Sequence, residues 1–144
     1  MENYVRKRVA TYFHINDYNC VRTDLLILAE HFKLTLGNQL LDASVGMHGA
    51  GGYRAQCGLV EGTLMFLGVA GAEKGTTEEE IVSACYDFGK AYERGFSSLQ
   101  CRTLRPGGFN EDDPPHLCED LACRSTVFSI GFVEKRLLLW DKSS

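Results

Sequence analysis

Residues 57–70 read CGLVEGTLMFLGVA, and this segment decides the fold class. When it is drawn as a helix, its apolar side chains lie all round the axis instead of along one stripe. A helix of that kind is stable only when other elements cover it. We therefore expect a buried central helix near 57–70, surrounded by amphipathic helices.

Two amphipathic helices are predicted before this central one. Apolar side chains recur four residues apart from Val5 to Phe13, which indicates a helix over about residues 2–14. Asn19 has the side chain of a helix cap, and it precedes a second apolar stripe. We expect this second helix to end near Gly37, because glycine is favoured just past a helix end.

Three further helices follow from the same kind of signal. Asn38 is placed to cap a short helix over about residues 39–44. Thr77–Glu80 has the form of a capping box, and the apolar stripe after it predicts a helix to about Ser98. The last helix is expected between Pro115 and Trp140. Period-two alternation is absent, so the sequence predicts one all-α domain over residues 1–144, a bundle of five or six helices.

Charge and hydropathy exclude several classes of partner. The formal net charge is −4 and basic residues are clustered only at residues 6–8, which argues against a nucleic-acid surface. No window approaches the ~18 apolar residues of a membrane span, and the N-terminus lacks the apolar core of a secretory signal. We therefore expect a cytoplasmic protein with no membrane insertion. The sequence contains no Ser-His-Asp order, no phosphate-binding glycine loop and no HExxH motif. It therefore does not indicate a hydrolase or a nucleotide enzyme.

Four of the six cysteines fall at predicted helix ends. Cys20 and Cys57 lie in first turns, Cys101 is expected to close the fifth helix, and Cys118 to open the last one. Helix ends are where side chains of separate helices can meet, so these four thiols are candidate metal ligands. Cys57 is also the candidate catalytic thiol, because the start of a helix favours the thiolate.

The two other cysteines are expected to lie outside this site. Cys85 is in the middle of the apolar stripe of its helix, which is typical of a core residue. Cys123 points about 140° away from Cys118 on an α-helix, so these two are poor partners for one site.

Glycines surround Cys57 in the sequence. Four of the seven residues from 46 to 52 are glycine, so no regular structure is expected there. Gly49 and Gly51 before Cys57, and Gly58 and Gly62 after it, are candidate cofactor-contacting positions. The alternative is that the helical glycines only let neighbouring helices pack tightly.

This pattern resembles a family of redox-active proteins labelled by its C-GCAxxG-C-C cysteine motif. The matching residues are Asn19-Cys20, Cys57-Gly58 through Gly62, Cys101 followed by Leu104, and Cys118. The resemblance implies a small helical protein with a redox or metal-dependent function. Genes of the family often lie near genes for transport. The pattern is also similar to a domain of split-Soret cytochromes that is associated with an iron–sulfur centre.

The chain departs from the family pattern in ways that bear on the cofactor. Leu59 stands where the family has alanine, and Met47, His48 and Ala50 interrupt the glycine-rich run. No Cys-x-x-Cys-His occurs, so a covalently attached haem is excluded. An iron–sulfur cluster stays open.

Three functions from different classes fit these observations. In the first, Cys20, Cys57, Cys101 and Cys118 hold an iron–sulfur cluster or another thiophilic metal for electron transfer or sensing. In the second, Cys57 attacks in metal-free thiol–disulfide chemistry and another of the four resolves. The third is a binding or scaffold protein whose cysteines fill the core. The partner would be a redox or transport-associated protein.

A histidine, two arginines and the C-terminal apolar run are further candidates. His48 is a possible fifth ligand, although a solvated loop histidine is the simpler interpretation. Arg54 and Arg102 flank Cys57 and Cys101, where they would favour thiolates if they were not simply exposed. Residues 137–140 are apolar at consecutive positions, which predicts a homodimer or a docked terminus.

Overall fold

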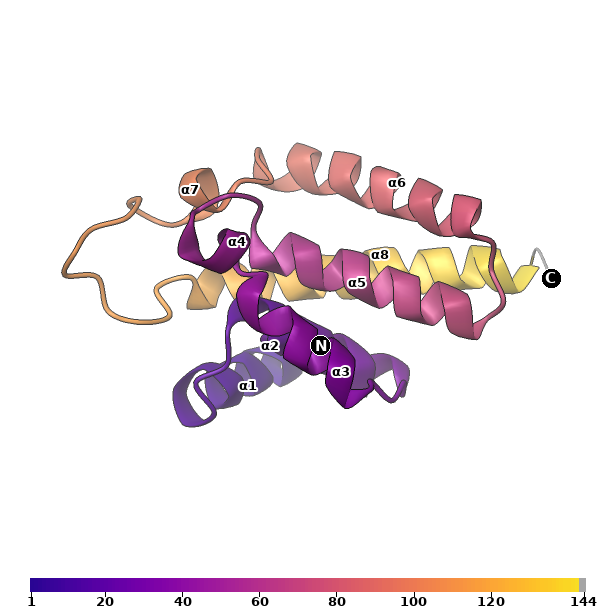
Figure 1. The fold of residues 1–144 in the computed structure, drawn as a ribbon, viewed down its shortest axis with the longest axis horizontal. Helices are drawn as coiled ribbons and strands as arrows, with labels where there is room; N and C mark the ends of the chain where they lie inside the picture. The colour runs from indigo at the N-terminus through magenta and orange to yellow at the C-terminus, as the bar shows by residue number, and fades with distance from the viewer. Residues whose placement is uncertain (143–144) are drawn as a thin grey trace.

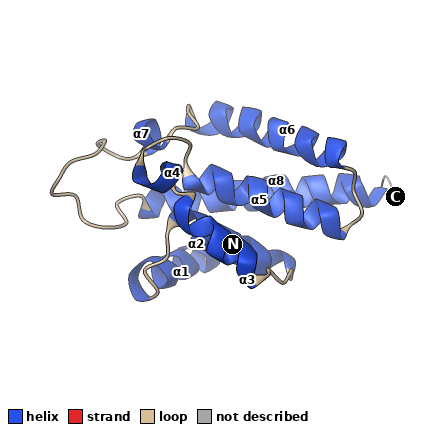
Figure 2. Ribbon diagram, in the orientation of Figure 1, coloured by secondary structure: helices blue, strands red, loops and turns tan. Residues whose placement is uncertain are grey.

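The structure, a computed structural model, describes residues 1–142, and the prediction of an all-α fold is confirmed. Within this range the regular elements are helices, and the only strand-like feature is an isolated pairing of Gln56 with Gln100 (Figures 1 and 2). The long helices are α1 (Glu2–Ala10), α2 (Cys20–Phe32), α5 (Gly58–Glu73), α6 (Glu78–Phe96) and α8 (Glu119–Lys142), and the short ones are α3 (Asn38–Ala43), α4 (Gly49–Gly52) and α7 (Cys101–Leu104).

Helix α5 is the centre of the bundle, as its sequence predicts. It packs against α2, α6 and α8, and in Figure 1 it runs between α6 and the pair α2 and α3, with α8 behind it. Leu59, Val60, Phe66 and Leu67 are each at most 1% exposed. The absence of a single apolar stripe on α5 therefore reflects neighbours on several sides.

The predicted helix starts are confirmed where a side-chain cap is present. Asn19 caps α2 by accepting a hydrogen bond from the Arg22 amide at 2.8 Å, and the Thr77–Glu80 capping box opens α6. The expected end of α2 near Gly37 is wrong. The helix ends at Phe32, because Lys33 adopts a left-handed conformation with φ of 57°.

Two elements near the N-terminus also differ from expectation. Gly37, and not Asn38, is the residue before α3, and Asn38 is its first helical residue. Helix α1 ends at Ala10, and the chain continues to Ile15 as a π-helical turn. The predicted single helix over residues 2–14 is therefore two successive helical segments, of which the second is wider.

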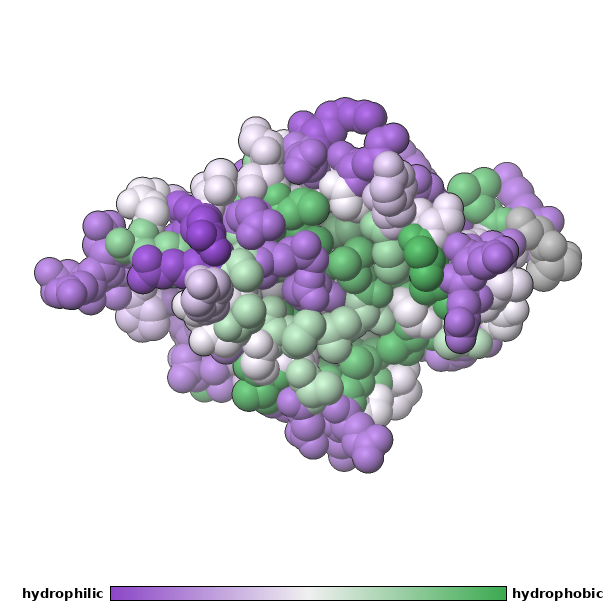
Figure 3. Space-filling view, turned by 45° about the horizontal axis from the view of Figure 1, so that its top comes forward, coloured by the Kyte–Doolittle hydropathy of each residue, from purple (hydrophilic) through white to green (hydrophobic). Residues whose placement is uncertain are grey.

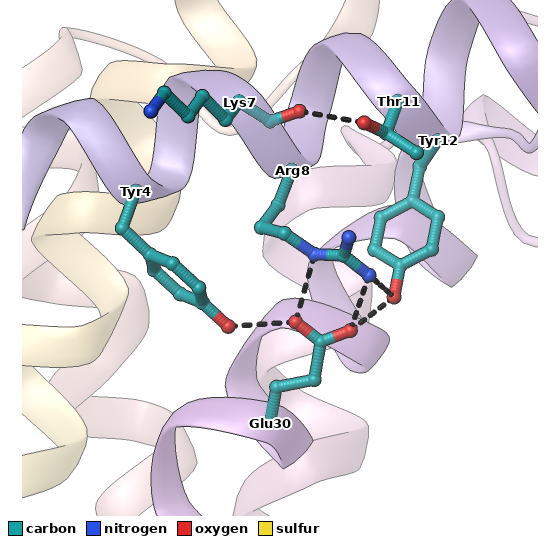
Figure 4. Close-up of polar contacts among 6 residues, drawn as sticks. All are labelled: Tyr4, Lys7, Arg8, Thr11, Tyr12 and Glu30. Atoms are coloured by element: carbon teal, nitrogen blue, oxygen red, sulfur yellow. Dashed lines mark hydrogen bonds and ion pairs between the residues drawn. The ribbon is translucent and has the colours of Figure 1, made fainter.

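A carboxylate on α2 fastens this N-terminal segment to the bundle (Figure 4). Glu30 accepts hydrogen bonds from Tyr4 (2.7 Å), from Nε and NH2 of Arg8 (3.0 and 2.8 Å) and from Tyr12. Burial acts to raise the pKa of Glu30, but the hydrogen bonds from Arg8 and the two tyrosines outweigh it and lower the pKa. Glu30 is thus held as a carboxylate at neutral pH.

The surface is apolar in places. Apolar residues form a band over the middle of the face shown in Figure 3, with hydrophilic residues around it. Over residues 1–142, none of the helices has the length and hydropathy needed to cross a bilayer. Near the C-terminus Leu138 and Leu139 are exposed while Trp140 is buried. Self-association through these leucines stays a prediction.

The short elements collect at one end of the bundle. In Figure 1, α4, α7 and the loop between α7 and α8 lie at the left, beside the starts of α5 and α8. Positive φ angles are frequent here, at residues such as Gly49, Ala50, Arg54 and His116. This end of the bundle carries the predicted cysteine residues.

Candidate functional site

The four cysteines predicted to form one site line one cavity. Cys20, Cys57, Cys101 and Cys118 all border a cavity of about 240 Å³ at the end of the bundle described above. The structure therefore brings together sulfurs that are up to 98 positions apart in the chain, from residue 20 to residue 118.

Cys20 and Cys57 are placed by the starts of α2 and α5. Cys20 is the first residue of α2, and Cys57 is the residue immediately before α5. Gly58 makes their approach possible, because a Cβ atom at this position would lie 2.3 Å from the Cys20 sulfur. No side chain larger than hydrogen fits between the two helix starts without a shift.

Cys57 and Cys101 are joined through the main chain. The Cys57 amide donates to Leu99 O at 2.8 Å, and the Cys101 amide donates to Ala55 O at 2.7 Å. The expectation that Cys101 closes the fifth helix is wrong, because α6 ends at Phe96 and Cys101 begins the separate helix α7. The two segments pair as a short β-bridge, which sets the cysteines side by side.

Cys118 is placed at the cavity by the start of α8. It directly precedes α8, and its carbonyl accepts a hydrogen bond from the Ala122 amide at 2.8 Å in the first turn. The loop between α7 and α8 folds back, as its glycines and prolines suggested. Cys85 and Cys123 lie outside the cavity, Cys85 between α5 and α6 and Cys123 on the buried face of α8.

Burial controls the protonation of these thiols. It raises the pKa of Cys57 to about 12, although the backbone N–H groups of Leu59 and Val60 act to lower it. The expectation of a lowered pKa at this helix start is therefore wrong, since desolvation exceeds the effect of the helix dipole. Burial also raises the pKa of Cys20, and the three other thiols add to that rise.

The four cysteines share the cavity with apolar side chains, among them Phe13, Leu59 and Leu121. Within residues 1–142, no three His, Cys, Asp or Glu side chains form a group that could hold a single metal ion. Cysteine thiolates are the soft ligands that iron–sulfur clusters and thiophilic metals take, so these four cysteines are the residues that would hold such a group.

Of the four glycines proposed to contact a cofactor, Gly58 lines the cavity, and Gly49, Gly51 and Gly62 do not. Gly49 lies against Cys101, where a Cβ atom would stand 3.3 Å from that of the cysteine. Gly62 serves helix packing, because its Cβ would lie 2.8 Å from Asp24 on α2.

Both histidines next to the motif border the cavity. His48 is half-buried, and its Nδ1 lies 3.3 Å from the amide nitrogen of Asn19. His116 stacks on Phe13 with ring centroids 4.5 Å apart, and its Nε2 lies 2.8 Å from Asp17. His48 is thus a partly buried turn residue at the wall of the cavity.

The arginines at the site are only partly those that the sequence indicated. Arg54 lines the cavity, but Arg102 is exposed and its Nε donates to Arg54 O at 3.0 Å. Arg105, which the sequence did not single out, lines the cavity and packs on Phe109. Its one signal in the sequence is its spacing of one helical turn after Cys101.

Sequence reasoning also missed a carboxylate below the cavity. Asp24 is fully buried one turn after Cys20, and it accepts hydrogen bonds from the hydroxyls of Thr63 (2.8 Å) and Thr126 (3.1 Å). These partners lie on α5 and α8, so Asp24 links three helices. Burial raises its pKa to about 7, against the effect of both hydroxyls.

Comparison with known proteins gives a family. Residues 18–130 match the model of the family described as "Putative redox-active protein (C_GCAxxG_C_C)", and this range includes all four cysteines of the cavity. No curated protein and no solved structure matches the chain. The match covers well over half of the sequence, so the chain belongs to the C_GCAxxG_C_C family.

Proposed function

We propose that the protein carries an iron–sulfur cluster on Cys20, Cys57, Cys101 and Cys118 and uses it for electron transfer. The observation that carries the proposal is the convergence of these four thiols on one cavity. They come from four separate segments of the chain, and the family is described as redox-active. Cysteines that only filled the core would have no reason to share a cavity.

The electrostatics of the cavity favour a metal cluster over free thiolates. Burial raises the pKa of all four thiols, so a nucleophilic thiolate is scarce at neutral pH. Binding of a metal deprotonates its thiol ligands, because the cation supplies the charge that burial withholds. A bound cluster would supply one-electron oxidation and reduction, with a potential set by charge, hydrogen bonds and solvent access.

Thiol–disulfide chemistry is the second candidate, and the same convergence favours it. The four cysteines are free thiols that line one cavity, so Cys57 has three candidate partners for a disulfide there. What speaks against it is the pKa of about 12 for Cys57, which leaves little thiolate to attack a disulfide.

Anaerobic reconstitution with iron and sulfide tests the proposal. We expect a visible charge-transfer band, with bound iron and sulfide in the protein fraction. Cys20→Ser, Cys57→Ser, Cys101→Ser and Cys118→Ser should each weaken or abolish the band. Cys85→Ser is the matched control, since Cys85 lies outside the cavity, and it should keep the band unchanged.

Two results would contradict the cluster. If no band forms and all four thiols titrate as free, the cavity does not assemble iron and sulfide. If oxidation instead removes two hydrogens reversibly by mass, and Cys57→Ser abolishes that change, the thiol–disulfide candidate replaces it.

A further inference from the structure

Arg105 is the most buried cation at the cavity. It follows α7 directly, it lines the cavity, and its side chain is 17% exposed. The guanidinium carbon lies 4.5 Å from the centroid of the Phe109 ring, and NH2 lies 3.4 Å from Asp113 Oδ2. Arg54 also packs on Phe109, and the guanidinium carbon of Arg54 lies 4.0 Å from the centroid of that ring. These contacts fix the Arg105 head group in place.

Arg105 lies next to two of the four cysteines. Its amide donates a hydrogen bond to Cys101 O, one helical turn earlier, at 3.1 Å, and Arg105 lines the same cavity as Cys118. A cation in this position favours the charged form of a neighbouring thiol. Arg105 is therefore placed where negative charge would collect if both sulfurs were ligands.

The hydrogen-bonding capacity of Arg105 is not used up. Its Nε is buried and has no acceptor among the described residues, and the contact of NH2 with Asp113 is long at 3.4 Å. A buried guanidinium N–H without an acceptor costs free energy, so such groups are normally satisfied. A group in the cavity with sulfur acceptors would satisfy it.

We infer that Arg105 is the charge-compensating residue of the four-cysteine cavity, which neutralises thiolate charge and donates hydrogen bonds to a bound sulfur-rich anionic centre. This inference rests on the proposed function. Four thiolates carry more negative charge than a typical iron–sulfur core carries positive charge, so the loaded site needs a nearby cation. Arg105 acts through the cysteines and the bound centre, as a positioning and tuning residue.

The sign of the effect on the reduction potential follows directly. Reduction adds one negative charge to the site, and a neighbouring cation stabilises the reduced form more than the oxidised form. Arg105 therefore raises the potential. Arg102 follows Cys101 directly in the chain, but it is exposed, and solvent and salt screen its charge. This difference makes Arg102 a matched control.

The test compares Arg105→Gln, Arg105→Lys and Arg102→Gln with the parent protein. In reconstituted protein, a dithionite titration followed by absorbance should show a more negative potential for Arg105→Gln. Arg105→Lys, which keeps the charge, should stay near the parent value. Arg102→Gln should leave the potential unchanged. Circular dichroism checks that each variant is folded.

A second measurement needs no cofactor. In reduced, metal-free protein at one alkaline pH, iodoacetamide labelling of Cys118 is followed by mass spectrometry of its peptide. Loss of a charged hydrogen-bond donor should slow labelling in Arg105→Gln by about tenfold. Arg105→Lys should fall between this variant and the parent, and Arg102→Gln should match the parent.

The outcomes separate the two proposals. A parent protein that forms no chromophore overturns the proposed function, whatever Arg105 does. A normal chromophore in Arg105→Gln, with unchanged potential and unchanged labelling, overturns the role of Arg105 and leaves the cluster intact. Equal shifts in Arg105→Gln and Arg105→Lys would also overturn it, because charge would not be the cause.

Discussion

At each end of the bundle, a glycine on α5 allows a neighbouring side chain to approach closely, but the two neighbours differ. At the cysteine end, a Cβ at Gly58 would lie 2.3 Å from the Cys20 sulfur. At the opposite end, a Cβ at Gly71 would lie 2.5 Å from Ile81, a flexible side chain on α6. Both glycines let α5 approach a neighbour closely. The difference is that Gly71 accommodates hydrocarbon, whereas Gly58 accommodates a candidate ligand atom.

The largest effect is expected from Gly58→Ala, with Gly71→Ala as its control. Gly58→Ala should abolish cluster binding, because the new methyl group displaces the Cys20 sulfur. It should also destabilise the fold by about 1–3 kcal/mol, the usual cost of overpacking. Reconstitution monitored by absorbance and unfolding in urea measure the two effects.

Gly71→Ala is the control at the other end of α5. It should cost stability of the same order or less, since the end of the Ile81 side chain can move, and cluster binding should stay intact. A Gly58→Ala protein with a normal spectrum would show that the close approach to Cys20 is not needed for the site.

A second comparison concerns the two carboxylates of α2. Asp24 has a pKa of about 7 because it is buried, whereas the pKa of an unfolded aspartate is about 4. As pH rises between these values, the unfolded state loses the proton first and folding becomes less favourable. The parent protein should therefore lose stability as pH rises from about 5 to about 8. In Asp24→Asn this loss should be smaller by about 2 kcal/mol, measured by urea unfolding.

Glu30 changes the stability of the fold with pH in the opposite direction. Its pKa is lowered, mainly because the hydrogen bonds from Arg8 and the two tyrosines exceed the effect of burial. It stabilises the fold above the usual carboxyl pKa, and this contribution disappears as pH falls through its lowered value. Glu30→Gln should therefore destabilise the protein at neutral pH but much less in acid. If both variants changed the pH profile in the same direction, this assignment would be wrong.

The smallest change in stability is expected at Gly68, a position on α5 that no neighbouring helix approaches closely. A Cβ at Gly68 would meet no atom within 4 Å. Gly68→Ala should therefore stabilise the fold by about 0.5–1 kcal/mol through helix propensity, without changing the visible spectrum of reconstituted protein. Thermal unfolding measures the gain, and a lower melting temperature would contradict it.

The sequence predicted those features that depend on neighbouring residues. The apolar surface of residues 57–70, the cap at Asn19 and the capping box at Thr77 are local signals, and the structure confirms each. The end of α2 was mispredicted because a lysine in the left-handed conformation, Lys33, has no sequence signal.

The site was predicted less completely, because its geometry depends on distant contacts. The four cysteines were identified, but the position of Cys101 depends on the pairing of Gln56 with Gln100, which no local pattern indicates. The low-pKa expectation for Cys57 failed because burial could not be judged from the sequence. Asp24 and Arg105 were missed since their partners lie on other elements.

The main-chain pairing beside the cavity has a consequence for sequence variation. The hydrogen bonds from Cys57 to Leu99 and from Cys101 to Ala55 involve only peptide groups, so they place no demand on the side chains of Leu99 and Ala55. Other side chains at these two positions can therefore keep the hydrogen bonds, although Leu99 also packs against the core. We expect the evolutionary constraint here to fall on spacing more than on residue identity.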